Sequence, residues 1–147
     1  MNLSSNVKVD QVLGYFAAGT TKRTSSILDM SGYEGVLFVA GLGTTIEGGT
    51  VDVYPEQNTS NSTVGMAEIA GTAAHTITAA NAALTQSCIV VDVYKPLERY
   101  IQCNVTPATQ NAVILGVVAI RYNGRIGPQA DGDSVILQTL LASAAEV

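Results

Sequence analysis

Three β-rich runs within residues 87–122 constrain the fold more than any other part of the sequence. They read SCIVVDVYK, PLERYIQCNV and TPATQNAVILGVVAIRY. Val, Ile and Tyr dominate the runs, and Pro, Asn and Thr occupy the short breaks between them, which is the pattern of strands joined by turns. We therefore predict three consecutive antiparallel strands. The last of them, residues 113–122, is apolar on both faces and is predicted to be a central strand.

Shorter strand patterns cover most of the chain before this region. Residues 12–18 and 24–30 are predicted strands, and 36–42 is apolar on both faces, which favours burial between two layers. Residues 50–54 alternate between apolar and polar side chains and are followed by Pro55, where we expect the strand to end. About eight short strands with turn signals every 8 to 12 residues predict an all-β fold, an antiparallel β-sandwich of jelly-roll type.

The low charge of the chain predicts assembly. At 147 residues it fits one domain, which buries roughly two thirds of the surface of the unfolded chain. Charged residues make up only 13% of it, about half the usual share. A chain with so little charge and with strands that are apolar on both faces is expected to cover part of its surface with copies of itself or with a partner.

Both termini are predicted to extend from the sandwich. We expect an N-terminal arm over residues 1–11, the sandwich over 12–125, and a linker with an arm or short helix over 126–147. Asp133 or Ser134 would cap that helix, and an arm or strand docking on a neighbouring subunit is the alternative. The apolar residues expected to contact a partner are Val7, Val9, Leu137, Leu140 and Leu141.

Charge and hydropathy argue against nucleic acid and membranes as partners. The net charge is −5, and the seven basic residues are scattered, whereas phosphate binding needs clustered Lys and Arg. The longest apolar run, residues 113–120, is far shorter than the ~20 residues of a membrane span. The N-terminus has no pattern of a secretion signal, so we expect a soluble protein in the cytosol of the cell that makes it.

No catalytic or metal-binding pattern is present. His75 is the only histidine, and the surrounding sequence offers no carboxylate to orient it. Two cysteines and one histidine do not supply a four-ligand zinc site, and the Asp131 and Asp133 pair lacks the spacing of a calcium loop. Cys88 and Cys103 are expected near the ends of neighbouring strands; a disulfide is conceivable there, but two buried thiols are favoured. We therefore expect no enzyme activity and no cofactor.

Two groups of side chains are candidates for binding. Four of the seven basic residues lie within about thirty positions and would either face an acidic partner or form salt bridges at strand ends: Lys95, Arg99, Arg121 and Arg125. Three tyrosines near strand ends would either line a sugar-binding face or act as ordinary strand residues: Tyr94, Tyr100 and Tyr122.

Residues 32–128 resemble the decoration (cement) proteins of tailed-bacteriophage heads. The resemblance lies in the order GYEGVLFVAG, TVDVY, VVDVYKPLERYIQCNV and VILGVVAIRYNGRIGP, of which YKPLERYIQC and AIRYNGRIGP are the most distinctive. It implies a structural virion protein, a jelly-roll homotrimer that binds the major capsid protein on the outside of the capsid and cements neighbouring subunits without catalysis. A glycan- or receptor-binding virion module is the alternative.

Overall fold

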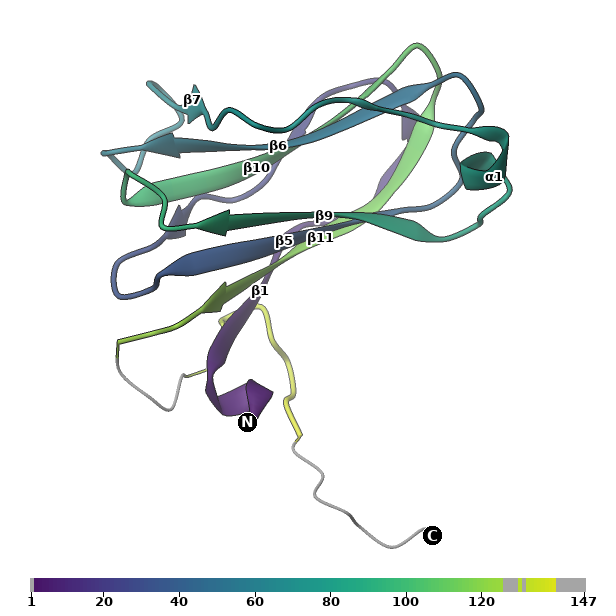
Figure 1. The fold of residues 1–147 in the computed structure, drawn as a ribbon. Coiled ribbons are helices and arrows are strands. Elements are labelled where there is room, and N and C mark those ends of the chain that lie inside the picture. Colours follow the sequence, from purple (N-terminus) through teal and green to yellow (C-terminus); the bar gives the residue numbers. More distant parts are fainter. Residues whose placement is uncertain (1, 126–129, 131, 140–147) are drawn as a thin grey trace, which may run out of the picture.

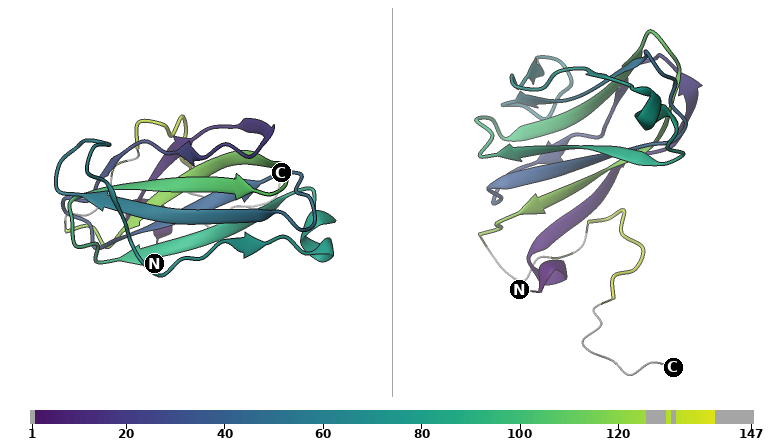
Figure 2. Two further views of the ribbon diagram at one scale, coloured as in Figure 1. Left: turned by 90° about the horizontal axis from the view of Figure 1, so that it is seen from above. Right: turned by 45° about the vertical axis from the view of Figure 1, so that its right-hand side comes forward.

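The computed structural model describes residues 2–125, 130 and 132–139 (Figure 1). Nearly all of its regular structure is β-strand, arranged in two antiparallel sheets that stack as layers (Figure 2). The helical elements are a short 3-10 helix, η1 (Leu3–Ser5), and one turn of α-helix, α1 (Ala79–Ala82). The capping box between Thr78 and Asn81 begins α1, as the alanine-rich sequence there favours.

Sheet A contains the first strand of the sandwich in sequence and the last, which is also the longest strand that the structure describes. Its order is β1-β11-β5-β9, with β2 pairing β11 beyond the end of β1. The strands are β1 (Val7–Leu13), β2 (Phe16–Gly19), β5 (Gly35–Leu42), β9 (Ser87–Tyr94) and β11 (Ala112–Tyr122). β11 is central, as predicted, because β1 and β5 flank it.

Sheet B forms the other layer, and its strands β10 and β6 lie in front in the left view of Figure 2. Its order is β3-β10-β6-β7, with β4 also pairing β10 and β8 also pairing β6. The strands are β3 (Arg23–Thr24), β4 (Leu28–Asp29), β6 (Thr50–Asn58), β7 (Ala67–Glu68), β8 (His75–Thr76) and β10 (Tyr100–Ala108).

The strand order is that of a jelly roll. β1 with β2, β3 with β4 and β7 with β8 are interrupted strands, because both members of each pair bond the same neighbour. Counting each pair once leaves eight strands, which are arranged first-eighth-third-sixth in sheet A and second-seventh-fourth-fifth in sheet B. This arrangement is the double Greek key of a jelly roll. The predicted fold class is therefore confirmed.

The core lies between the two sheets and is almost entirely apolar. Phe38 from sheet A and Ile101 from sheet B are fully buried, and valine is the commonest residue of the core. In β6 the predicted alternation holds, because Val51 and Val53 are buried and Asp52 between them is not. We expected β6 to end at Pro55, but the strand continues to Asn58. Pro55 is buried within it, opposite Cys103.

Residues 87–122 form three strands, but the strands are not consecutive neighbours. β9 belongs to sheet A, β10 to sheet B and β11 again to sheet A, so each connection crosses between the layers. Cys88 is therefore exposed on sheet A while Cys103 is buried on sheet B, and both thiols are free. The prediction of two buried thiols is therefore confirmed for Cys103 and wrong for Cys88. Burial raises the pKa of the Cys103 thiol to about 12.

The expected N-terminal arm over residues 1–11 is wrong from residue 7 onward. β1 begins at Val7 and pairs with β11 in register from Val7 opposite Tyr122 to Gln11 opposite Val118. Val7 is buried and Val9 is half-buried, and the register places Val9 beside Ile120, on the side of sheet A that faces away from the core. Their predicted contact with a partner stays a prediction. The alternation of Val7, Val9 and the polar residues between them was the strand signal.

The C-terminal segment contacts the free edge of β1. The backbone N–H of Gly132 donates to the carbonyl of Val9 at 3.2 Å, and the N–H of Gln11 donates to Ser134 Oγ at 2.7 Å. Residues 132–139 form a turn and irregular chain rather than the helix that Asp133 or Ser134 would cap. Residues 140–147, with Leu140 and Leu141, lie outside the described residues.

A β-bulge at Leu115 shapes the middle of β11. Ile114 pairs with Leu42 and Gly116 with Gly41, so Leu115 is an extra residue without a partner on β5. Gly116 has φ +142°, and a Cβ there would lie 2.7 Å from the carbonyl oxygen of Leu13. Only glycine fits this backbone without strain.

We predict that Gly116→Ala lowers the free energy of unfolding by about 1 to 3 kcal/mol, because alanine is strained at this φ and contacts the backbone of Leu13. Chemical denaturation measures the change. Gly14→Ala is the control, since a Cβ at Gly14 meets nothing within 4 Å. Equal stability of the two variants would show that the bulge tolerates a side chain.

Candidate functional site

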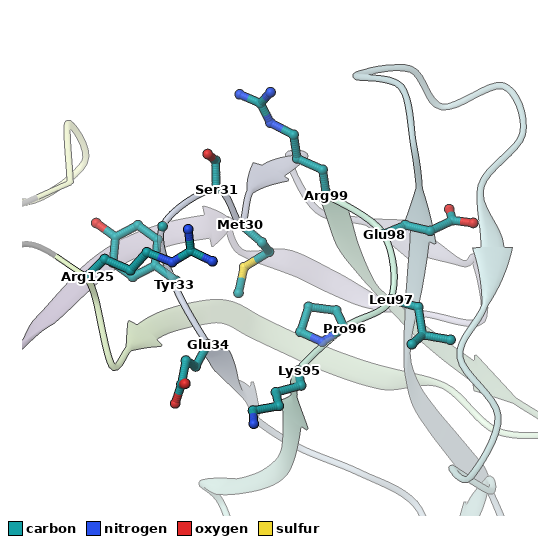
Figure 3. A pocket seen from close by; sticks show the side chains of 11 residues that line it. Met30, Ser31, Tyr33, Glu34, Lys95, Pro96, Leu97, Glu98, Arg99 and Arg125 are labelled. Carbon is teal, nitrogen blue, oxygen red and sulfur yellow. The ribbon is translucent and has the colours of Figure 1, made fainter.

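Three turns meet at one end of the sandwich and enclose a hollow of about 450 Å³ (Figure 3). The first turn, residues 30–34, precedes β5, and the second, residues 95–99, connects β9 to β10. The third segment, residues 123–125, follows β11. The lining residues are Met30, Ser31, Gly32, Tyr33, Glu34, Lys95, Pro96, Leu97, Glu98, Arg99 and Arg125.

Backbone hydrogen bonds hold the three turns together. The N–H of Lys95 donates to the carbonyl of Glu34 at 2.7 Å, and the N–H of Arg125 donates to the carbonyl of Gly32 at 2.8 Å. The N–H of Met30 donates to the carbonyl of Arg99, also at 2.8 Å. The hollow is therefore built on backbone contacts between elements of both sheets and not on side chains alone.

Local sequence explains the shape of these turns. Gly32 has φ +87°, which glycine adopts readily, and Lys95 and Asn123 have φ +53° and +51°. Before Gly32, the carboxylate of Asp29 accepts from the N–H of Ser31 at 2.9 Å, which is an Asx turn. The SGYEG sequence thus forms a tight bend that presents Tyr33 and Glu34.

The structure brings together three of the four predicted basic residues. Lys95, Arg99 and Arg125 all line the hollow, with Met30 and Pro96 between them in Figure 3. Glu34 and Glu98 line it as well, so the site carries both signs of charge. Such a surface fits a polar partner surface with its own pattern of charges rather than a polyanion.

The three cations differ in the partners they already have. Arg99 donates two 2.9 Å hydrogen bonds to the carboxylate of Asp29, and these bonds lower the pKa of that carboxyl below its usual value. Lys95 and Arg125 form no ion pair with any residue that the structure describes. The predicted salt bridge therefore occurs at Arg99, while a contact of Lys95 and Arg125 with an acidic partner stays a prediction.

Arg121, the fourth basic residue, is buried within the chain and is not available to a partner. It is 7% exposed, and its guanidinium donates to Asp10 Oδ2 at 2.6 Å and to the carbonyl of Asp29 at 2.8 Å. The ring of Tyr33 lies 5.0 Å from it. Arg121 faces the core side of β11 because Tyr122, next to it, faces the other side.

The three predicted tyrosines do not form one face. Tyr100 begins β10 in sheet B, whereas Tyr94 and Tyr122 lie in sheet A on either side of Gly35. The hydroxyl of Tyr122 donates to Asp92 at 2.6 Å. Partial burial and then this contact raise the pKa of Tyr122 above its usual value.

The remaining candidate side chains have ordinary surroundings. His75 is exposed, and its Nε2 lies 2.9 Å from Asn81 Oδ1, as expected for a surface histidine. Asp133 is exposed, and Asp131 lies outside the described residues. In the part of the chain that the structure describes, no three His, Cys, Asp or Glu side chains are placed to hold a metal ion.

Sequence reasoning missed the first turn of the hollow. The predicted strand 24–30 ends at Met30, and Tyr33 and Glu34 lie between predicted strands, although all three line the hollow. The signal was the SGYEG sequence itself, since a polar bend with an aromatic and an acidic residue next to a strongly apolar strand is a surface feature.

Comparison with known proteins finds structural likeness only. No family model matches the sequence, and no curated protein sequence matches it. Among solved structures, the dimeric latent PorU of Porphyromonas gingivalis aligns at 11% identity and a TM-score of 0.43, over 80% of this chain and 12% of that one. The structure of infectious bursal disease virus Gt strain aligns at 12% identity and a TM-score of 0.44, over 81% of this chain and 32% of that one.

These likenesses carry no argument about function, since both TM-scores are below 0.5. The chain spans well under two thirds of either solved chain. The assignment of the fold rests on the strand order of the protein itself. Among the described residues, no helix has the length and apolar character needed to cross a membrane.

Proposed function

We propose that this protein is a capsid decoration protein of a tailed bacteriophage, which binds the outer surface of the head as a homotrimer and cements neighbouring copies of the major capsid protein. It acts by binding and carries out no reaction. It is made in the cytoplasm of the host cell and ends in the virion.

One observation carries this proposal. The two segments with the most distinctive resemblance to decoration proteins, YKPLERYIQC and AIRYNGRIGP, are separated by residues 104–118, which hold the second half of β10 and the first part of β11. Their charged residues Lys95, Arg99 and Arg125 nevertheless line the same hollow. The resemblance therefore concentrates at one surface, which is what a shared binding site would produce.

The character of the hollow also suits a binding surface. Leu97 at its rim is 91% exposed, which is unusual for a leucine in a turn fixed by hydrogen bonds. The N–H groups of Leu97 and Glu98 donate to Gln57 Oε1 at 3.1 and 3.3 Å, so the turn is held in place before any partner binds. A fixed turn with an apolar tip and flanking cations loses little entropy on binding.

Sedimentation of purified protein with heads of the phage that encodes it tests the proposal. Expanded heads should carry the protein through a density gradient and saturate at a fixed number of copies. Protein that stays at the top of the gradient at micromolar concentration would contradict the proposal.

We predict that the double variant Lys95→Gln, Arg125→Gln binds heads about tenfold more weakly, a loss of about 1.4 kcal/mol, because both cations lack an ion pair within the chain. Binding of the wild type should weaken with salt, and that of the variant less so.

The matched control is Lys22→Gln, Arg23→Gln, which removes the same charge away from the hollow. Lys22 pairs with Glu56 on sheet B, and Arg23 lies over the ring of Phe16. This control should bind heads like the wild type. Equal loss in both double variants would indicate a general effect of net charge and would exclude the hollow as the contact.

A further inference from the structure

The side of sheet A that faces away from the core is apolar. We call it the outer face. In the register of the sheet, Val39 on β5 lies between Val118 on β11 and Val90 on β9. One row further, Leu37 lies next to Ile120. The bulge adds Leu115 to the same face, where its Cβ lies against Gly41.

Only one charged residue interrupts the outer face. Asp92 on β9 is opposite Leu37, and its carboxylate accepts the hydroxyl proton of Tyr122 at 2.6 Å. Val90 is 52% exposed and Leu115 47% exposed, and Leu37 and Val39 are half-buried. Antiparallel sheets with one solvated side normally show polar residues there. The prediction that residues 36–42 are buried between two layers is therefore wrong for the chain alone, since nothing in its described part covers Leu37 and Val39.

The two edges of sheet A differ in whether another segment bonds to them. At the β1 edge, Gly132 and Ser134 bond the backbone of Val9 and Gln11. At the β9 edge, no strand of the described residues pairs with the eight residues from Ser87 to Tyr94. β9 has no proline, lysine or bulge to protect this edge from pairing. The open edge adjoins the apolar face, so both belong to one unprotected surface.

We propose that the outer face with the adjoining β9 edge is the surface through which copies of this chain assemble. The inference goes beyond capsid binding, because it assigns a second surface at a different place on the sandwich. Interfaces between permanently associated copies are strongly apolar, whereas interfaces formed by proteins that are first stable alone are as polar as ordinary surface. An apolar face that stayed open until a capsid arrived would drive aggregation.

The size of the surface agrees with such a contact. Four strands about 4.8 Å apart and about seven residues long, at roughly 3.3 Å per residue, give a flat footprint of about 450 Å². This is as large as the largest apolar patch of a typical monomer and about half of the roughly 800 Å² that each partner supplies to a standard interface. The β9 edge adjoins the face, so the contact we propose uses both.

Mass measurement of a face variant and a matched control tests this assignment. The face variant is Val90→Asp, Leu115→Asp. The control, Val64→Asp, Leu84→Asp, makes the same two changes at positions that are 84% and 49% exposed outside the strands of sheet A and outside the hollow. Wild type and control should show a multiple of the 15.2 kDa chain mass, three copies if the trimer is right. The face variant should be monomeric, because assembly would bury two carboxylates. Its dissociation constant should be at least about a hundredfold higher than that of the wild type.

A thiol probe gives a second readout that needs no variant. Cys88 lies on the outer face opposite Gly41, and Cys103 is buried in the core. A maleimide should label Cys88 slowly in the concentrated wild type and faster on dilution below the dissociation constant, with Cys103 unlabelled in both.

Two results would overturn the proposal. One is a wild type that is monomeric at tens of micromolar with Cys88 labelled at full rate, which would assign the face to another occupant such as the capsid protein. The other is a folded face variant that keeps the mass of the wild type. Head binding is scored separately by sedimentation, so a monomer that still binds heads would refute this inference and the homotrimer but leave the proposed capsid-binding role standing.

Discussion

Replacement of Arg121 by leucine is expected to lower the free energy of unfolding by about 3 kcal/mol. The guanidinium joins three parts of the fold, because it bonds Asp10 on β1 and the backbone of Asp29 on β4 while β11 carries it. Its removal leaves the carboxylate of Asp10 beside the core without its cation and the carbonyl of Asp29 without its donor. Denaturant titration measures the loss as a shift in midpoint at constant slope.

The control for this prediction is the same substitution at an exposed ion pair. Arg99→Leu removes the two hydrogen bonds to Asp29, but the pair is open to solvent, so the loss should stay below about 1 kcal/mol. If Arg121→Leu cost no more than Arg99→Leu, the buried guanidinium, which bonds Asp10 in its own sheet and the carbonyl of Asp29 in the other, would not connect the two sheets energetically.

Phe38→Ala is expected to have the largest effect of any single change, a loss of about 3 to 5 kcal/mol. Phe38 is 0% exposed and lies on β5 in the middle of sheet A, so alanine leaves a cavity that rigid strands on both sides cannot close. Phe16→Ala is the control, since Phe16 is half-buried at the end of sheet A against Arg23 and should cost clearly less. Thermal and denaturant unfolding both report the difference. Equal losses would show that the core is centred elsewhere.

The sequence predicted the fold class because strand signals are local. Alternation in residues 50–54 and the apolar runs of 36–42 and 113–122 identified the strands correctly. Pairing is not local, and nothing in residues 87–122 distinguishes a hairpin from a connection that crosses between sheets. Pro55 shows the same limit of local reasoning. A proline usually ends a strand because it has no N–H to donate, yet β6 continues through Pro55.

The site was predictable in part for a related reason. Lys95, Arg99 and Arg125 were chosen because they are close in sequence, and the turns that carry them do meet. Arg121 belongs to the same run of sequence, but the alternation of β11 directs it to the core, where Asp10 from the other end of the chain pairs with it. A partner 111 positions away is invisible to reasoning from nearby residues.

Assembly was inferred from low charge, and the structure adds the surface on which we place it. The apolar side chains of residues 36–42 were correctly identified as too many for one buried face. In the chain itself half of them point away from the core, so the prediction of a second covering layer becomes a proposal about a neighbouring copy. The hollow and the outer face are then two separate binding surfaces, one polar and one apolar.

The heat stability of phage heads tests the cementing role most directly. Heads that lack the protein are warmed with a DNA-binding dye, with and without saturating amounts of the purified chain, and the temperature of DNA release is recorded. A protein that binds across neighbouring capsid subunits stabilises the intact head by mass action, so release should shift to higher temperature and the shift should grow with concentration until the sites are filled. An unchanged release temperature on heads shown by sedimentation to be saturated with the protein would contradict the cementing role.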